Sequence, residues 1–332
     1  LVEHFVANKK KWPFRKLVAD EATKIKSTRT KQGSIRGAAF LKMARAAQHV
    51  TELTGTPAPN GIQDLWGQMF PLDFGTRLGS SYSAFTNRWF YPHPSGYGIV
   101  PKDRAQAEIQ ELLRDICITI DAKDFFELEE PIVNLIPVDL PPKAREIYDG
   151  MEKKMYAELD GLPRSSFAFE DGRTPDNLDE LEAVEAVSAA GRTIKALQIA
   201  SGNVYADSQN KSWAEVHDAK LRALESVIAE ASAPVLVSYW WKPDLPRLKK
   251  AFPQGRVLDK NPKTIRDWNA GKIPLMFAQP GSAGHGLNLQ DGGNVLCHYS
   301  FWWDLEVHQQ VLERIGPARQ KQSGHDRPVY VH

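Results

Sequence analysis

The sequence has few cysteines, no long apolar run and no excess of either charge. Its two cysteines among 332 residues, Cys117 and Cys297, lie far apart and without metal-ligand spacing, which argues against a disulfide framework or a zinc cluster. Its short apolar runs predict neither a membrane-spanning helix nor a signal peptide, so we expect a soluble, intracellular protein. Because 42 lysines and arginines face 41 acidic residues, any contact with a charged polymer must come from local patches.

What the sequence does contain is a regular alternation of strand and helix patterns. Hydrophobic residues make up 42% of the chain, enough for two cores of ordinary size. Strand patterns at 15–19 and 48–53 flank a helix-compatible segment, 33–47, and so predict a βαβ unit. From Leu181 onward, helical segments alternate with short apolar strands such as 234–239. This alternation predicts an α/β fold whose strands form parallel sheets.

A joint rich in proline and acidic residues, 121–142, separates the two parts of this pattern. We place the domain boundary within it and expect one domain over residues 1–125 and a second over residues 126–332. Residues 161–178, rich in glycine, proline and polar side chains, predict an exposed loop.

Two adjacent carboxylates, Asp20 and Glu21, follow the first predicted strand. Ligands of open parallel sheets bind beyond the carboxyl ends of the strands, so polar residues at this place are candidates for chemistry. One carboxylate can hold a Mg²⁺ ion through water, and the other can polarise an attacking water. The dipeptide alone is equally compatible with a solvated acidic turn.

Two further polar segments follow predicted strands. Thr54-Gly55-Thr56-Pro57, with Asn60, comes after the strand at 48–53, and its small hydroxyl residues can sense a phosphate. The run 281–286 is rich in glycine and follows the strand at 274–278, so its backbone amides can approach a phosphate closely. Each segment alone is also an ordinary turn or loop sequence.

Together, four segments occur in the order and approximate separations of the later motifs of the Swi/Snf-like helicases. They are DEATKIK at 20–26, LTGTPAPN at 53–60, SAGHGLNLQ at 282–290 and QQVLERIGPARQ at 309–320. The chain resembles most closely the bacteriophage-type members of this group, which belongs to helicase superfamily two. The resemblance implies two RecA-like lobes with parallel sheets, the first incomplete, plus helical insertions. It also implies ATP-dependent helicase or translocase activity in the inter-lobe cleft, with ATP and Mg²⁺ as cofactors, DNA as partner, and the cytoplasm of a bacterium or phage-infected host as location.

The resemblance also assigns roles to residues. In the DEAH-like box, Asp20 matches the residue that holds Mg²⁺ through water, and Glu21 matches the one that activates the hydrolytic water. The residues expected to couple the nucleotide to DNA are Thr54, Gly55, Thr56, Asn60 and Gln310. The residues expected to contact DNA in the second lobe are Ser282, Gly284, Gly286, Asn288 and Gln290.

Cations beside the acidic turn are candidates for phosphate contacts. Lys24 and Lys26 begin a run of basic residues that extends to Arg36. Such a run suits contacts with a nucleic-acid backbone, and a solvated face explains it equally well.

Two arginines are candidates for the arginine finger that neutralises charge on a transferred phosphate, Arg319 and Arg314. The common family pattern places two arginines three residues apart, but Pro317 occupies the second of these positions here. We favour Arg319 slightly, because Arg314 can instead be an ion-pair partner of Glu313 or Asp291.

The sequence contains no phosphate-binding loop of the form G-x-x-x-x-G-K-[ST], although a motor of this kind needs one. Its ends also look cut, since it lacks an initiator methionine and stops within a strand-like segment. We therefore expect a fragment that does not hydrolyse ATP alone and that relies on an N-terminal segment or a second polypeptide for the phosphate loop. The alternative is a non-hydrolysing DNA-binding or regulatory remnant of such a motor.

Two tryptophan pairs follow predicted strands of the second part. Trp240-Trp241 can stack on bases or on adenine, or pack within the protein. The same two roles are open to Trp302-Trp303, for which we favour packing in the core.

Overall fold

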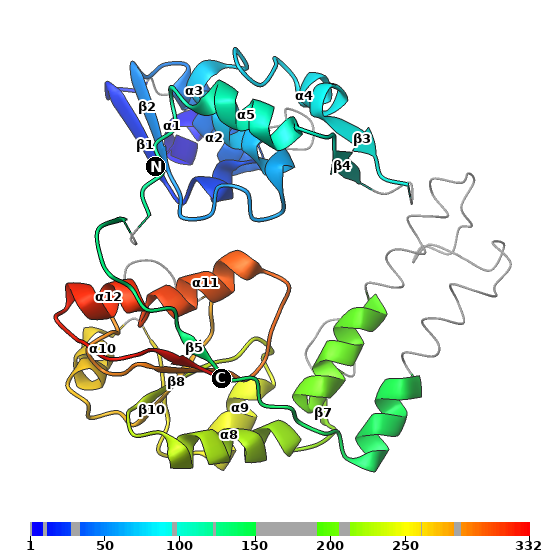
Figure 1. Ribbon diagram of the computed structural model, residues 1–332, viewed down its shortest axis with the longest axis vertical. Helices are drawn as coiled ribbons and strands as arrows, with labels where there is room; N and C mark the ends of the chain where they lie inside the picture. Colours follow the sequence, from blue (N-terminus) through cyan, green and yellow to red (C-terminus); the bar gives the residue numbers. More distant parts are fainter. Residues whose placement is uncertain are drawn as a thin grey trace, which may run out of the picture. The chain divides into compact units, whose positions relative to one another are not determined.

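The computed structural model describes residues 2–8, 12–27, 34–94, 98–121, 124–150, 191–205, 213–259, 261–281 and 287–332. The chain divides into two compact units, Leu1–Ile120 and Asp121–His332 (Figure 1). The boundary expected from the sequence, after residue 125, lies a few residues further along the chain. The predicted loop 161–178 lies outside the described residues. None of the helices within the described ranges combines the length and apolar character needed to cross a membrane.

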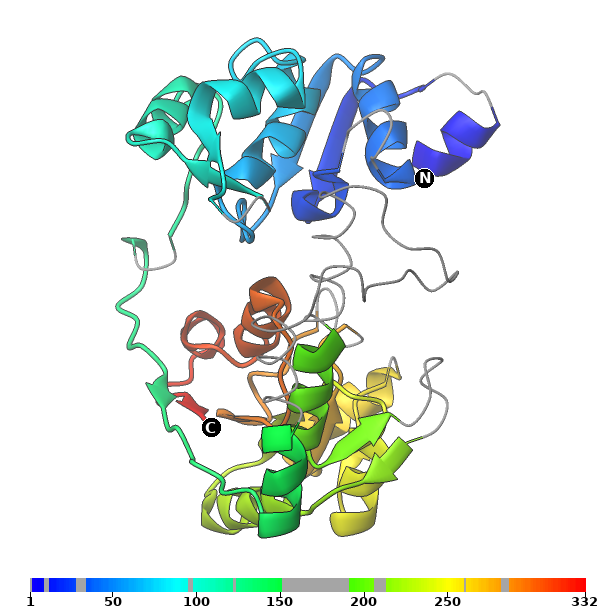
Figure 2. The same cartoon turned by 90° about the vertical axis from the view of Figure 1, so that its right-hand side faces the viewer.

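The first unit is built on a βαβ arrangement, as the sequence predicts. Strand β1 (Lys16–Asp20) pairs in parallel with β2 (His49–Leu53), and helix α2 (Ile35–Ala44) connects them. The Ser34 hydroxyl caps α2 by accepting a hydrogen bond from the Gly37 amide at 3.0 Å. Helix α1 (Val2–Ala7) packs against α2. Figure 2 shows these two helices on one side of the strand pair and the later helices of the unit on the other.

A helical part completes the first unit around an aromatic core. Among its core side chains, Phe85 and Ile109 are fully buried. Two short antiparallel strands form a hairpin between its second and third helices. The elements are α3 (Leu65–Asp73), α4 (Tyr82–Trp89), β3 (Phe90–Pro92), β4 (Ile99–Pro101) and α5 (Ala105–Leu113).

The second unit contains a six-stranded sheet with strand order β5-β12-β11-β8-β10-β9, and all its neighbouring strands are parallel. The α/β fold with parallel sheets is therefore confirmed. Every residue of the central strands β8 and β10 is buried, as expected for strands covered on both faces. The strands are β5 (Ile132–Val133), β8 (Val235–Ser238), β9 (Arg256–Val257), β10 (Leu275–Ala278), β11 (Val295–His298) and β12 (Tyr330–Val331).

Helices cover both faces of this sheet (Figure 1). Alternate strand residues point to opposite faces, so Leu236 joins Trp268 and Val311 in one core, whereas Val237 joins Leu224 and Leu248 in another. The helices of the first core are α10 (Pro262–Asn269) and α11 (Leu305–Glu313), followed by α12 (Pro317–Gln322). Those of the second core are α8 (Ala219–Glu230) and α9 (Asp244–Ala251). A short antiparallel pair, β6 (Asn203–Tyr205) and β7 (Trp213–Glu215), precedes α8.

Trp268 fixes the loop before β11 and provides a test of the packing. Its buried indole donates a hydrogen bond from Nε1 to the Leu289 carbonyl at 2.8 Å. A side chain at Gly292 would overlap this indole and the Trp268 carbonyl. We expect Gly292→Ala to lower the free energy of unfolding by about 2 kcal/mol, because overpacking forces buried groups apart. Urea unfolding measures this, and Gly191→Ala, where the added methyl meets open space, should cause no comparable loss.

Candidate functional site

The two motif-bearing strands of the first unit end side by side. In the parallel pair β1–β2, Asp20 at the end of β1 lies opposite Leu53 at the end of β2. The turn that begins at Glu21 and the loop that begins at Thr54 therefore leave adjacent strand ends. Segments more than thirty residues apart in the printed sequence are brought to one edge of the sheet, the edge where ligands of parallel sheets bind.

The acidic turn has a well-defined backbone geometry. Glu21 adopts left-handed angles, φ 56° and ψ 57°, which cost a non-glycine residue about 1–2 kcal/mol. Its amide donates to Asp20 Oδ1 at 3.0 Å, and its carbonyl accepts a hydrogen bond from the Lys24 amide at 3.0 Å. Left-handed backbone in a non-glycine residue is concentrated at functional sites, where the surrounding structure holds it in place.

The donor set at this turn fits a magnesium ion held through water. The Asp20 side chain is exposed at the end of its strand. Mg²⁺ retains several waters and binds through one or two carboxylates together with phosphate oxygens. A cage made of protein side chains alone is not needed, and no group of three or more histidine, cysteine or acidic residues in the described ranges is arranged to form one.

The loop after β2, which begins at Thr54, is tied to the segment after the acidic turn through Asp64. Asp64 Oδ2 accepts hydrogen bonds from Lys26 Nζ at 2.7 Å and from Asn60 Nδ2 at 3.1 Å. Within the loop, the Thr56 amide donates to Thr54 Oγ1 at 3.1 Å. The ion pair is partly buried, with 27% of the Lys26 side chain and 14% of the Asp64 side chain exposed. Lys26 is thus engaged within the protein, whereas the Lys24 side chain is exposed.

Glu52 is a half-buried acid whose carboxylate oxygens are shielded from solvent, and the sequence alone does not single it out. It precedes Leu53 in β2, and neither carboxylate oxygen has a hydrogen-bond partner among the described residues. Burial raises the pKa of its carboxyl group from 4.5 to about 8, since a charge is poorly solvated there. The available signal was one glutamate within the strand pattern QHVTEL.

In the second unit, the end of the glycine-rich motif contacts α12. Asn288 Oδ1 accepts a hydrogen bond from Arg319 Nη1 at 2.6 Å, and Gln290 Nε2 donates to Ser323 Oγ at 2.8 Å. Gln310, on α11, donates to Glu306 at 3.2 Å within its own helix. The remaining predicted residues of the motif lie outside the described residues; they are Ser282, Gly284 and Gly286.

Gln320, the last residue of the fourth motif, holds these segments together. It is 1% exposed, and its Nε2 lies within hydrogen-bond distance of the carbonyls of Gln290, Gly293 and Ile315, at 3.0–3.2 Å. Its Oε1 accepts a hydrogen bond from Arg327 Nε at 2.9 Å. The sequence analysis assigns no role to this residue, although the resemblance covers it.

The two candidate arginines differ in their surroundings. Arg314 is 6% exposed, whereas Arg319 is partly exposed and contacts Asn288. Asp291, one of the two acids considered as partners for Arg314, lies 2.9 Å from His325 Nε2. Arg319 therefore presents the more accessible guanidinium group.

Aromatic side chains gather after β8 and β11, at the carboxyl edge of the second sheet. The rings of Trp240 and Trp302 stack in parallel, with centroids 5.8 Å apart. Trp303 is 70% exposed and Phe301 is 50% exposed, so the expectation of core packing is wrong for Trp303. After β11, Tyr299 and Ser300 are still buried, and the loop reaches the surface from Phe301 onward.

Asp244 fixes the loops that carry the stacked tryptophans. It is fully buried, accepts hydrogen bonds from Ser300 Oγ at 2.6 Å and from the Trp241 amide at 3.0 Å, and receives a third from Asn203 at 2.7 Å. Burial raises the pKa of this carboxyl group, and the three hydrogen bonds oppose that shift. The Ser300 hydroxyl also accepts the Trp240 amide at 2.7 Å.

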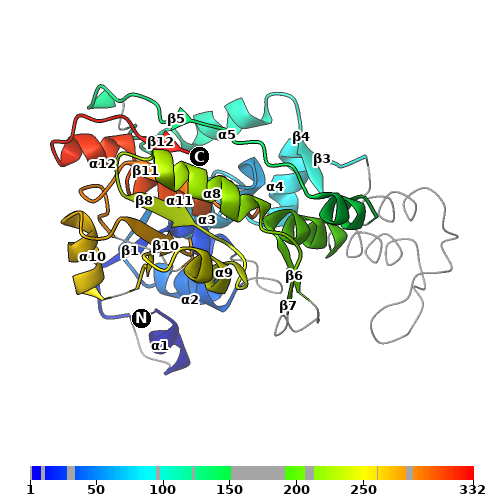
Figure 3. The same cartoon turned by 90° about the horizontal axis from the view of Figure 1, so that it is seen from below.

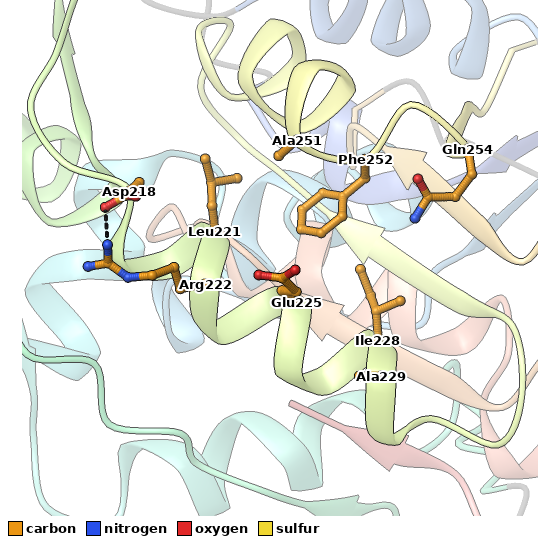
Figure 4. Close-up of a pocket in the computed structure, with 9 residues that line it drawn as sticks. All are labelled: Asp218, Leu221, Arg222, Glu225, Ile228, Ala229, Ala251, Phe252 and Gln254. Atoms are coloured by element: carbon orange, nitrogen blue, oxygen red, sulfur yellow. Dashed lines mark ion pairs between the residues drawn. The ribbon is translucent and has the colours of Figure 1, made fainter.

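A hollow of about 420 Å³ lies between α8 and the end of α9 (Figure 4). Its walls come mainly from these two helices, and it contains none of the predicted site residues. Its lining residues are Asp218, Leu221, Arg222, Glu225, Ile228, Ala229, Ala251, Phe252 and Gln254.

Comparisons with known proteins bear on these motifs. No family model matches the sequence. The chain is 50% identical over 327 residues to "Putative protein p41" of Acyrthosiphon pisum secondary endosymbiont phage 1, covering 97% of this chain and 66% of that protein. It is 23% identical over 334 residues to "Putative ATP-dependent helicase/translocase YwqA" of Bacillus subtilis, covering 94% of this chain and 32% of that protein. The chain thus spans just under two thirds of the first relative and about a third of the second.

The chain resembles the Swi/Snf-like helicases. The resemblance inferred from the four motifs is therefore confirmed, and a phage protein is among the relatives. Solved structures with similarity include the Sulfolobus solfataricus SWI2/SNF2 ATPase core in complex with dsDNA, at 20% identity and a TM-score of 0.40, covering 100% of this chain and 65% of that one. The Pyrococcus furiosus Hef helicase domain matches at 10% identity and a TM-score of 0.40, covering 99% of this chain and 74% of that one.

Glu52 predicts an unusual dependence of stability on pH. Between its ordinary pKa of 4.5 and its folded pKa of about 8, the folded protein keeps a proton that the unfolded chain releases. The free energy of unfolding should therefore fall as pH rises through this interval, by at most about 1.4 kcal/mol per pH unit, and level off above it.

Glu52→Gln should flatten this slope, as measured by urea unfolding at a series of pH values. The exposed Glu111, paired with Arg114 at 2.6 Å, supplies a matched control in the same unit, and Glu111→Gln should retain the wild-type slope. An unchanged slope in Glu52→Gln would show that Glu52 is ionised in the folded protein.

Proposed function

We propose that this chain is part of an ATP-dependent DNA translocase or helicase. The observation that carries the proposal is the parallel pairing of β1 with β2, which brings the Asp20-Glu21 turn and the Thr54-Gly55-Thr56 loop to one edge of a sheet. The motif order and the similarity to a helicase/translocase over 94% of the chain support it.

In this proposal the acidic turn performs the hydrolytic chemistry. Asp20 holds Mg²⁺ through water, and Glu21 orients the attacking water and accepts its proton. Bound Mg²⁺ and ATP supply a polarised phosphoanhydride bond. The left-handed backbone at Glu21 turns the chain sharply at the second of the two acidic residues.

The coupling step involves the loop after β2. Thr54, Gly55 and Thr56 respond to the state of the nucleotide, and Asn60 transmits that response because it shares Asp64 with Lys26. A displacement of either segment changes the geometry at the shared carboxylate.

In the second unit, exposed Asn288 contacts DNA together with the preceding glycine-rich residues, and Gln310 belongs to the coupling machinery. Gln290 was expected to contact DNA as well, but it is 7% exposed and donates to Ser323, so it supports the motif from within the protein. Arg319 acts as the arginine finger, for which its partial exposure is the supporting observation. Buried Arg314 has a structural role, because removing a guanidinium from such a place leaves its neighbours without a partner.

The 332 residues contain no sequence of the form G-x-x-x-x-G-K-[ST]. We infer that residues outside these 332 bind the β and γ phosphates. We also infer that the 332 residues alone bind DNA without hydrolysing ATP. ATP hydrolysis by the polypeptide as encoded in its genome, compared with hydrolysis by these 332 residues, tests this inference.

Glu21→Gln should abolish DNA-stimulated ATP hydrolysis by the encoded polypeptide while nucleotide binding persists. The substitution removes the proton acceptor but keeps the size of the side chain, so a loss of at least about 100-fold is expected. Phosphate release and binding of a fluorescent nucleotide are the measurements. Hydrolysis at the wild-type rate in the variant contradicts the role of Glu21, and absence of hydrolysis in the unmodified polypeptide favours a non-hydrolysing DNA-binding remnant.

Substitutions of Arg319 and Arg314 should differ in their effects on thermal stability and on the rate of ATP hydrolysis. Arg319→Ala should lower the hydrolysis rate about 10³-fold or more, as loss of an arginine finger does, with little change in unfolding midpoint. Arg314→Ala should lower the midpoint clearly, since its side chain is buried. A thermally stable, inactive Arg314→Ala variant together with an active Arg319→Ala variant would reverse the assignment.

A further inference from the structure

The β3–β4 hairpin of the first unit presents exposed aromatic and basic side chains that none of the four motifs includes. The strands pair antiparallel from Phe90 opposite Pro101 to Pro92 opposite Ile99. The hairpin lies beside α4, at the end of the unit away from β1 and β2 (Figure 3). Tyr91, at its centre, is 60% exposed. An exposed tyrosine ring next to cations is a typical contact for a nucleic acid base.

Arg88 lies next to this hairpin in a fixed orientation. Its guanidinium lies over the ring of Trp89, with 4.3 Å between Cζ and the ring centroid. Trp89 is 2% exposed and is itself held by a hydrogen bond from Nε1 to Glu108 Oε2 at 3.0 Å. Within the described part of the chain, the exposed Arg88 side chain has no hydrogen bond or ion pair. A stacked guanidinium that keeps its N–H groups available is preorganised to bind a phosphate.

Lys102 fastens the hairpin to the end of α4. Its Nζ donates to the carbonyls of Asn87 at 2.7 Å and Arg88 at 3.0 Å, where a cation is favoured by the helix dipole. The same ammonium lies 5.1 Å from the centre of the Tyr91 ring. The Lys102 amide also donates to the Trp89 carbonyl at 2.8 Å. These contacts fix the positions of Arg88 and Tyr91 relative to each other before any ligand binds.

The local charge favours an anion. Exposed Arg104 follows at the start of α5 and, in the ranges that the structure describes, has no ion pair. Among the acids nearby, Glu108 is engaged by Trp89, and Asp103 is exposed. Three cations, Arg88, Lys102 and Arg104, thus lie on or directly beside the hairpin in the chain, against the two carboxylates of Asp103 and Glu108.

We propose that the base of the β3–β4 hairpin is a binding site for single-stranded nucleic acid. Arg88 and Arg104 contact phosphates, Tyr91 stacks on an unpaired base, and Lys102 is the positioning residue that holds the hairpin against α4. The proposal rests on the proposed function in that DNA is the polymer, and it adds a contact outside the helicase motifs.

The experiment measures binding of a fluorescent single-stranded oligonucleotide by anisotropy at several salt concentrations. Arg88→Gln should weaken binding several-fold and reduce the salt-dependence exponent by about 0.7, the value for one phosphate contact on a single strand. Tyr91→Ala should weaken binding at least about 5-fold, and Tyr91→Phe should restore it. The same substitutions at Tyr91 should change binding to a duplex of the same sequence less.

Arg114→Gln supplies the control of equal charge. Arg114 is exposed at the end of α5 and pairs with Glu111 at 2.6 Å, so its loss should leave affinity and salt dependence as in the wild type. If Arg88→Gln and Arg114→Gln weaken DNA binding equally, net charge alone explains the loss of affinity, and the proposed site is contradicted. If the wild type binds DNA and none of the hairpin substitutions changes that binding, the hairpin site is contradicted and the proposed function is not. If the wild type binds no DNA, both are contradicted.

Discussion

The parallel pairing of strands is the constraint on which the rest of the structure depends. Parallel strands end at a common edge, so segments distant in sequence must meet there. In the first unit this places the residues after Asp20 beside those after Leu53. In the second unit the same rule aligns Ser238 with Ala278 and with His298. The loops after β8 and β11, which carry the aromatic side chains, therefore begin at a common edge. The acidic turn and the loop that begins at Thr54 do the same in the first unit.

Buried or partly buried polar side chains then fasten the segments that the strands bring together. Asp64 joins the segment after β1 to the loop after β2, and Gln320 joins the glycine-rich motif to the fourth motif. Asp244 does the same for the loops after β8 and β11. A buried polar group left without its partner costs about 1–3 kcal/mol, so each junction resists separation.

The elements could be predicted from the sequence, whereas these junctions could not. The βαβ unit and the parallel sheet follow from apolar periodicity and from short strands bounded by turn residues, which are local signals. The partners of Asp64 and Gln320 include residues 38 and 30 positions away, and no local pattern specifies such a pair. Trp303 was assigned to the core because tryptophan is usually buried, but it follows a strand end, and its loop exposes it. The distinction between Arg314 and Arg319 likewise depends on burial, which only the packed helices determine.

Two unfavourable features are concentrated where the first sheet meets its motifs. Glu21 has left-handed backbone, and the carboxylate oxygens of Glu52 in the neighbouring strand have no hydrogen-bond partner among the residues that the structure describes. Glycine at position 21 and leucine at position 52 would remove both costs without altering the pairing of β1 with β2. The sequence has glutamate at both positions. The strained backbone at Glu21 produces a sharp turn at the residue that is proposed to activate the attacking water, and such strain is typical of functional sites. The pKa of Glu52 is raised to about 8, so the strand that leads to the loop at Thr54 carries a carboxyl group that binds a proton near neutral pH, one residue before the strand ends.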